Sequence, residues 1–214
     1  IISGIDLIGT CIGHISLNKV NTGKDIKPGN LIIGLASSGV HSNGLTLARR
    51  VLMGDSMEEQ KSRVNDYEEF LGQTLGEALL EPTRIYVKPV MEMLDSGIDL
   101  KAMVHITSGG FCNLNRVECD NIRFVIDTLQ PVPEIFNIIQ DRGGVSEAEM
   151  FEVFNMGTGF CLIVEGTKEA EAITEICKKH DLPCQVIGQV EASQGKEVFL
   201  PTKQLTGKVE YYLA

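Results

Sequence analysis

Residues 31–53 of the 214-residue chain read LIIGLASSGVHSNGLTLARRVLM, and this stretch decides how the chain is expected to fold. The run at 31–36 is short and apolar, which is typical of a buried strand. Small residues and two glycines interrupt the pattern at 37–44. Apolar residues then recur at helical spacing from 45 to 52, so the stretch predicts a strand, a glycine-rich loop and a helix in succession.

The rest of the chain mixes strand and helix patterns without strict alternation. The polar stretch at 54–76 indicates a surface insertion, and the glycine-punctuated connector at 21–29 is the best candidate for a domain boundary. Further strands are expected at 5–15, 102–106, 122–126, 160–164 and 185–190, and further helices from Pro89 to Gly97, from Pro133 to Gly143, after the capping-box pair Ser146 and Glu149, and at 168–180. This mixture predicts an α+β fold, a layered α/β/α domain with a mixed sheet.

Composition excludes several classes of partner. The chain has 19 Lys and Arg against 29 Asp and Glu, a net charge of −10, so nucleic acid is not expected as a partner. No apolar run approaches the ~20 residues that span a bilayer, so no membrane partner is expected either. The six cysteines lack metal-binding spacing, which favours reduced thiols in a cytoplasmic protein. The chain begins at Ile1 without Met and inside an apolar run, so we expect it to be cut from a longer chain.

The loop at 37–44 has the features of an anion-binding turn. It lies between a predicted strand and a predicted helix, where free backbone N–H groups and the helix dipole favour negative charge. Ser38, Ser42 and Asn43 add side-chain donors, and glycine allows close approach to a phosphate. The spacing matches neither the Walker A motif nor the dinucleotide-binding motif. A glycine-rich turn without a ligand explains the same residues, so the chemistry alone leaves both interpretations open.

Two further glycine-rich loops repeat this pattern. In the loop at 105–110, His105 is either a general acid or base or a half-buried strand residue. In the loop at 154–159, the glycines either shape a binding cleft or serve only in a cap and turn. Arg84 and Lys88 are candidates to meet a phosphate, although each is also explained as a solvated charge. Three such loops favour a phosphorylated ligand over a two-carboxylate hydrolase.

Five strings of the chain together resemble the signatures of one enzyme family, the phosphoribosylformylglycinamidine cyclo-ligases or aminoimidazole ribonucleotide synthetases. The strings occur in the family's order at 34–44, 75–89, 105–107, 154–159 and 186–190. The resemblance covers roughly residues 4–190. A single string would be weak evidence for the family, whereas five strings in the family's order are specific evidence.

The resemblance implies the fifth step of purine biosynthesis. ATP with Mg²⁺ activates the formyl oxygen of formylglycinamidine ribonucleotide, a nitrogen of the same substrate closes the imidazole ring, and ADP and phosphate are released. It also implies a homodimer formed through an N-terminal domain that holds the nucleotide loop and the metal-binding aspartates. Residues 1–28 are then the last strands of that domain plus a linker, and residues 29–214 form the C-terminal α+β domain. No metal ligands are expected in this chain, which alone is expected to be inactive.

The resemblance also implies roles for individual residues. The implied catalytic residues are His41, His105 and Thr107. The residues implied to bind substrate or nucleotide phosphate are Ser38, Gly39, Ser42, Asn43, Gly44, Gly109, Gly110, Asn155 and Gly157. The chain departs from the family at Ser108, where the family has glycine, and in the shortened segment 113–116. Because a Cβ disfavours positive φ, Ser108 predicts a changed loop shape.

Two alternative functions stay open from the sequence. One is a paralogue of the same fold, similar to selenophosphate synthetase, thiamine-monophosphate kinase or the hydrogenase maturation protein HypE. The other is a module that binds a phosphorylated ligand without turnover, because no counterpart of the nucleotide-binding half is found in the chain.

Overall fold

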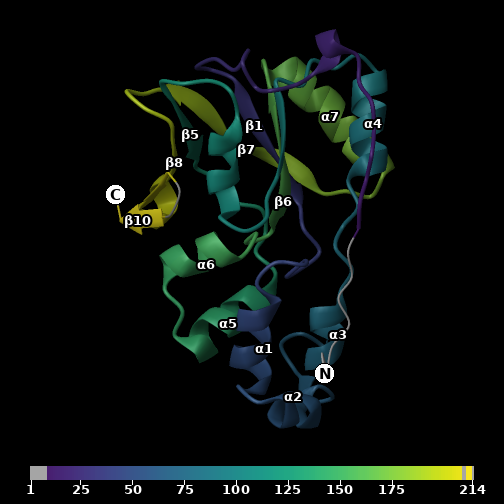
Figure 1. The fold of residues 1–214 in the computed structure, drawn as a ribbon, viewed down its shortest axis with the longest axis vertical. Helices are drawn as coiled ribbons and strands as arrows, with labels where there is room; N and C mark the ends of the chain where they lie inside the picture. Colours follow the sequence, from purple (N-terminus) through teal and green to yellow (C-terminus); the bar gives the residue numbers. More distant parts are fainter. Residues whose placement is uncertain (1–8, 209–210, 214) are drawn as a thin grey trace.

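The computed structural model describes residues 9–208 and 211–213, which form an eight-stranded mixed sheet with helices around it (Figure 1). The strand order is β10-β9-β8-β5-β7-β1-β6-β4, and all neighbours are antiparallel except β5 and β8. The strands are β1 (Leu31–Ala36), β4 (Ala102–His105), β5 (Ile122–Ile126), β6 (Thr158–Val164), β7 (Cys184–Ala192), β8 (Glu197–Leu200), β9 (Leu205–Gly207) and β10 (Tyr211–Leu213). A small separate hairpin pairs β2 (Tyr67–Glu68) with β3 (Gln73–Thr74).

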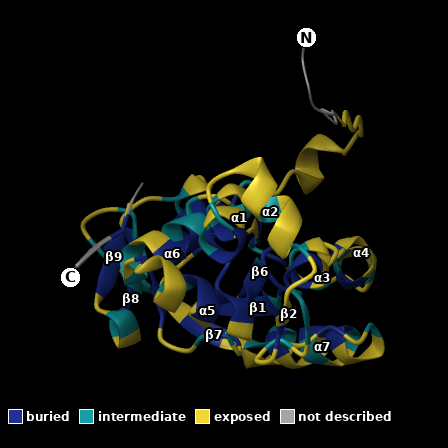
Figure 2. Cartoon of the chain, turned by 90° about the horizontal axis from the view of Figure 1, so that it is seen from below, coloured by how far each residue is buried: buried dark blue, intermediate teal, exposed yellow. Residues whose placement is uncertain are grey.

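Helices pack on both faces of the sheet, so the predicted α+β class and α/β/α layering are confirmed. The helices are α1 (Leu45–Met53), α2 (Met57–Arg63), α3 (Leu75–Leu80), α4 (Val87–Asp95), α5 (Glu134–Gly143), α6 (Glu147–Val153) and α7 (Thr167–Lys179). One core cluster joins Leu52 of α1 and Phe136 of α5 to strand residues such as Phe124. A second joins Met93 of α4 and Ile173 of α7 to the opposite face. Figure 1 shows α4 and α7 together beside the sheet, and Figure 2 shows the buried residues gathered between the layers.

Local sequence explains where several helices begin and end. Ser56 and Thr74 each form a complete capping box, with Glu59 and Glu77 respectively, before α2 and α3. The Ser146 side chain accepts a hydrogen bond from the backbone N–H of Glu149, as predicted for the start of α6. Glycines in the left-handed region follow α4 at Gly97 and α5 at Gly144, because the chain turns there through a conformation that side chains disfavour.

Most predicted elements are confirmed to within one or two residues. The helix that contains Pro89 begins at Val87, so Pro89 takes the third helical position rather than the first. The polar stretch at 54–76 is largely exposed, as predicted, although Glu68 and Leu75 are buried in it. The sequence patterns did not predict β8, β9 and β10, whose short runs add to one edge of the sheet.

The predicted strand at 5–15 is wrong where the structure describes it. Residues 5–8 lie outside the described residues, and residues 9–15 have no regular secondary structure and are exposed. A strand needs a neighbour for its backbone hydrogen bonds, and no described strand pairs with this segment. Figure 2 shows the segment projecting from the body of the molecule.

The connector at 21–29 packs against the body of the domain. Ile26 is buried, and the backbone N–H of Glu118 donates to the Thr22 carbonyl at 2.8 Å. A Cβ at Gly23, which has φ +84°, would lie 2.5 Å from the Val117 side chain, so only glycine fits this approach. The assignment of 1–28 to another domain stays a prediction.

All six cysteines are free thiols. Cys161 and Cys177 are buried on apolar faces, as predicted, and burial raises the pKa of the Cys161 thiol. Cys184 differs, because its interaction with the neighbouring Cys177 thiol lowers the pKa of Cys184. Within the described part of the chain, none of the helices has the length and apolar character needed to cross a bilayer.

Candidate functional site

Three loops that carry predicted site residues meet at one end of the sheet. β1 and β4 both run antiparallel to β6. The C-terminal ends of β1 and β4 therefore lie at the same end of the sheet as the N-terminal end of β6. The loops 37–44, 106–110 and 154–157 extend from these ends. Backbone hydrogen bonds join them, from Ser37 N–H to the Gly157 carbonyl at 2.9 Å and from Ile106 N–H to the Gly159 carbonyl at 3.0 Å. Strings far apart in the sequence therefore form one region.

The segment 82–86 packs against the first of these loops. The Ser38 hydroxyl donates to the Pro82 carbonyl at 2.7 Å. The Tyr86 hydroxyl donates to the Ala36 carbonyl at 2.9 Å, at the end of β1, and burial raises the pKa of this phenol. The segment 75–89, which is distant from the 37–44 loop in the sequence, thus packs against one side of that loop.

His41 occupies the centre of the first loop. Its side chain is 8% exposed, and its φ of +53° is uncommon for a residue with a Cβ. Its Nε2 atom accepts hydrogen bonds from the backbone N–H of Ser38 at 3.1 Å and of Arg84 at 3.4 Å. Burial, together with the nearby charges of His105 and Arg84, lowers the pKa of His41 to about 4. The imidazole is therefore neutral near pH 7.

Two positions of this loop, Gly39 and Ser42, have few close neighbours. A Cβ at Gly39, which has φ +149°, would meet nothing nearer than the Glu81 Cγ at 4.0 Å. Ser42 is exposed, and its hydroxyl lies 3.4 Å from that of Thr83. The loop is therefore exposed at Ser42, whereas Gly39 itself is buried, and phosphate binding here stays a prediction. Gly44 differs, because a Cβ there would lie 2.4 Å from the Phe154 ring.

The third loop is a scaffold for the first. Asn155 is buried, its Nδ2 donates to the Gly39 carbonyl at 2.8 Å, and its Oδ1 accepts from the Gly157 backbone N–H at 3.0 Å. A Cβ at Gly157, which has φ +91°, would lie 2.8 Å from the Pro131 carbonyl oxygen. A Cβ at Gly159 would lie 2.0 Å from the Tyr86 hydroxyl oxygen and 2.8 Å from His41 Cε1. These residues hold the first loop and its histidine in place.

The second loop is linked to the first through Thr107. The Thr107 hydroxyl donates to Asn43 Oδ1 at 3.0 Å. Gly109 and Gly110 have φ of +86° and +52°, and a Cβ at Gly110 would lie 1.9 Å from the Phe151 carbonyl oxygen. Ser108 is not among the described residues with positive φ, so its Cβ imposes no strain of that kind, and the changed loop shape stays a prediction. His105 is exposed at the end of β4, with its ring centroid 6.4 Å from that of Phe160.

Asn113, which the sequence patterns did not single out as a site residue, anchors the second loop from inside. Asn113 is 2% exposed, and its Nδ2 donates to the carbonyls of Gly110 at 2.6 Å and Ser108 at 3.1 Å. Grooves of about 490 Å³ and 440 Å³ flank it, and both include Arg116. The only signal in the sequence was that segment 113–116 departs from the family pattern.

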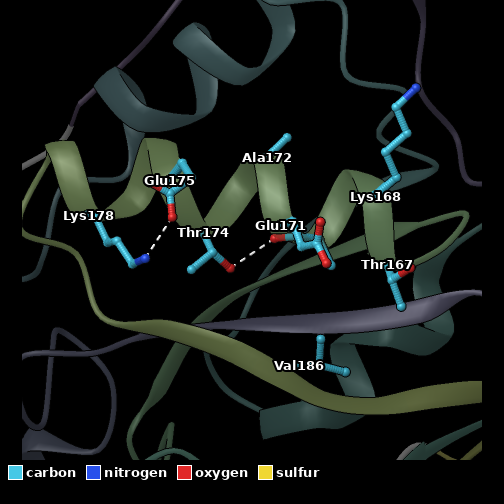
Figure 3. Close-up of a pocket in the computed structure, with 9 residues that line it drawn as sticks. Thr167, Lys168, Glu171, Ala172, Thr174, Glu175, Lys178 and Val186 are labelled. Atoms are coloured by element: carbon cyan, nitrogen blue, oxygen red, sulfur yellow. Dashed lines mark hydrogen bonds and ion pairs between the residues drawn. The ribbon is translucent and has the colours of Figure 1, made fainter.

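A larger groove, of about 670 Å³, lies away from these loops between α7 and β7 (Figure 3). Its charged side chains are solvated or paired, as Lys178 is with Glu175 at 2.6 Å. Lys168 stands at the opposite end of the groove in Figure 3, near the start of α7. None of the predicted site residues lines this groove.

The described residues fit an anion better than a metal ion. No group of three or more His, Cys, Asp or Glu side chains is placed to hold a metal among the described residues. By contrast, the Nδ1 of His41 and the Nε of Arg84 are buried and have no hydrogen-bond partner among the described residues. Both atoms suit an oxyanion, because guanidinium and imidazole N–H groups donate.

The mixed sheet between two helical layers, with glycine-rich loops gathered at one end, defines the chain as a layered α+β domain. A sequence model of the family described as "AIR synthase related protein, C-terminal domain" matches residues 27–201. The chain belongs to this family.

Relatives with assigned names give a closer comparison. The chain is 46% identical over 210 residues to the phosphoribosylformylglycinamidine cyclo-ligase of Methanococcus maripaludis strain C7, covering 98% of this chain and 57% of the relative. It is 47% identical over 191 residues to the protein of that name from Methanocaldococcus jannaschii, covering 88% of this chain and 52% of the relative. The chain thus spans little more than half the length of these relatives.

Solved structures confirm the fold. "T. maritima PurL complexed with FGAR" superposes with a TM-score of 0.52 at 14% identity, over 90% of this chain and 29% of that chain. Escherichia coli HypE, a hydrogenase maturation protein, superposes with a TM-score of 0.51 at 17% identity, over 89% of this chain and 52% of that chain. At these identities the likeness concerns the fold alone.

Proposed function

We propose that the chain is the C-terminal part of an ATP-dependent phosphoribosylformylglycinamidine cyclo-ligase of purine biosynthesis. The observation that carries the proposal is the 46% identity, over 98% of the chain, to a protein of that name. The convergence of the loops 37–44, 106–110 and 154–157 supports a shared site at the end of the sheet.

In the proposed reaction, ATP supplies the phosphoryl group that makes the formyl oxygen a leaving group. A nitrogen of the same substrate attacks the formyl carbon, and phosphate leaves with that oxygen. We assign the phosphorylated part of a ligand to the 37–44 loop, on the side where Ser42 is exposed. We assign the reacting end to Thr107 and His105, which lie on the neighbouring loop and strand. Asn43 positions the Thr107 hydroxyl by accepting its hydrogen bond.

The rest of the proposal concerns the intact protein. It includes Mg²⁺ held by residues outside this chain, a homodimer formed through another domain, and a cytoplasmic location.

The test is an assay of ADP release by the intact protein that contains this chain, with formylglycinamidine ribonucleotide, ATP and Mg²⁺. We expect turnover with this substrate and none from the 214-residue chain alone. Turnover only with selenide, thiamine monophosphate or carbamoyl phosphate would establish a paralogue instead. Saturable binding without turnover of any of these substrates would establish a binding module.

A further inference from the structure

Two buried donors beside the candidate loop lack a hydrogen-bond partner among the described residues. They are the Nδ1 of His41 and the Nε of Arg84. The two residues are neighbours, because the Arg84 backbone N–H donates to the other ring nitrogen of His41 at 3.4 Å. A buried polar atom without a hydrogen-bond partner destabilises the folded state. A ligand atom that accepts hydrogen bonds from these two donors would remove this cost.

The hydrogen bonds of His41 determine which ring nitrogen carries the proton. Its Nε2 receives two backbone N–H groups, from Ser38 at 3.1 Å and from Arg84, and a backbone N–H only donates. The Ser38 hydroxyl, 3.1 Å from the same atom, has its single proton on the Pro82 carbonyl. Nε2 is therefore an acceptor, and in the neutral ring the proton lies on Nδ1.

Arg84 supplies a charge that no carboxylate among the described residues neutralises. Its Nη1 donates to the Asp181 carbonyl at 3.5 Å, which is a neutral acceptor. No carboxylate in the described part of the chain lies within 4.0 Å of the guanidinium. A partly buried guanidinium prefers an anion with which it can form paired hydrogen bonds.

We propose that Arg84 and the Nδ1–H of His41 together bind one phosphoryl group. His41 then acts as a neutral hydrogen-bond donor and not as a base, and its two backbone bonds orient it for this role. The phosphoryl group belongs to a nucleotide or to a phosphorylated substrate, and the choice of these ligands rests on the proposed function. Ser42, which follows His41 in the same loop, is exposed, so the loop borders solvent beside His41.

The main test titrates the full 214-residue chain with inorganic phosphate, ATP and ribose 5-phosphate, observed by NMR with ¹⁵N-labelled histidine. At pH 7 we expect His41 as the neutral Nδ1–H tautomer, with its signals shifting saturably on addition of phosphate. ATP binding more tightly than ribose 5-phosphate would identify a nucleotide subsite, and the reverse order a substrate subsite. An Nε2–H tautomer, or phosphate that leaves the His41 signals unmoved, would overturn the proposal.

Matched variants separate the contribution of each donor. Arg84→Gln is expected to weaken phosphate binding by about 10-fold to 100-fold, as for loss of a charge-assisted hydrogen bond. His41→Gln keeps an acceptor near the position of Nε2 and should weaken binding, whereas His41→Asn keeps a donor near Nδ1 and should weaken it less. Lys168→Gln makes the same charge change in the α7 groove and should leave binding unaltered.

Two results would contradict the assignment. One is equal weakening by Lys168→Gln and Arg84→Gln, which would indicate a general charge effect. The other is wild-type affinity in Arg84→Gln. If phosphate binds as expected while the intact protein fails to turn over formylglycinamidine ribonucleotide, the subsite stands and the proposed function fails. If the intact protein turns over this substrate while phosphate does not bind at His41 and Arg84, the proposed function stands and the subsite fails.

Discussion

The loops 37–44 and 154–159 look alike in sequence and differ in what they do with their polar groups. In the third loop, both amide atoms of Asn155 are used inside the fold, and the Gly157 position is blocked by the Pro131 carbonyl. In the first loop, a Cβ at Gly39 would meet no atom nearer than 4.0 Å, and the Nδ1 of His41 has no partner among the described residues. A glycine-rich string therefore marks either a close approach of the chain to itself or a close approach to a ligand. Only the surrounding structure distinguishes the two.

The strongest test of this comparison is Gly157→Ala. The new Cβ would lie 2.8 Å from a backbone oxygen, at a φ of +91° that side chains disfavour. We expect the free energy of unfolding to fall by about 3 kcal/mol or more. The clash lies between two backbone segments, one at Gly157 and one at Pro131, and neither can move easily. Denaturant unfolding followed by circular dichroism measures it.

Gly29→Ala is the control for Gly157→Ala. Gly29 has almost the same φ, +93°, but a Cβ there meets nothing within 4 Å. This variant should lose only the conformational cost, about 1–2 kcal/mol. Equal losses in both variants would show that packing against Pro131 does not matter.

The second prediction concerns Asn155→Ala. It removes two buried hydrogen bonds and leaves the Gly39 carbonyl and the Gly157 N–H without partners. We expect a loss of about 2–4 kcal/mol in the free energy of unfolding, from chemical denaturation. If the variant keeps its stability and only its ligand binding is weakened, Asn155 contacts the ligand and is not part of the scaffold.

The sequence predicted the strands that carry these loops because their apolar runs are buried, as Ile32 and Ile163 are. It also predicted which residues gather at one end of the sheet, through their resemblance to a family. It could not separate scaffold from binding surface, because Asn155 and Asn43 are the same residue type in similar strings. The pairing of Arg84 with His41 depends on contacts between segments 43 residues apart. The predicted strand at 5–15 fails from residue 9 onward because hydrophobic alternation indicates a strand without supplying its partner.

The third prediction contrasts Asn43→Ala with Asn155→Ala. Asn43 is partly exposed and accepts one hydrogen bond, from Thr107 at 3.0 Å. Its loss should cost the fold less than about 1 kcal/mol, but should lower kcat/KM of the intact protein about tenfold. Steady-state kinetics and a Tm measurement on the same sample test both parts. Ser38→Ala is expected to behave similarly, and unchanged kinetics in both variants would assign the first loop a structural role only.

The smallest effect is the pH dependence that His41 gives to stability. Burial and the charges of His105 and Arg84 lower the pKa of His41 to about 4 in the folded chain, from the ordinary 6.5 of an exposed imidazole. Between pH 6.5 and pH 4 the unfolded chain therefore binds a proton that the folded chain does not, so stability falls as the pH is lowered through this window.

The variant His41→Gln removes this titration while keeping an acceptor for the Ser38 and Arg84 N–H groups. Its Tm should fall less steeply than that of the wild type between pH 6.5 and pH 4, as measured by differential scanning calorimetry. His180→Gln is the control for replacing a histidine outside the candidate site, since that ring lies between α4 and α7, 2.7 Å from the Glu92 carboxylate. If His41→Gln and the wild type show the same slope, His41 is charged in the folded chain, and the contrast between a neutral donor in the first loop and a closed scaffold in the third no longer holds.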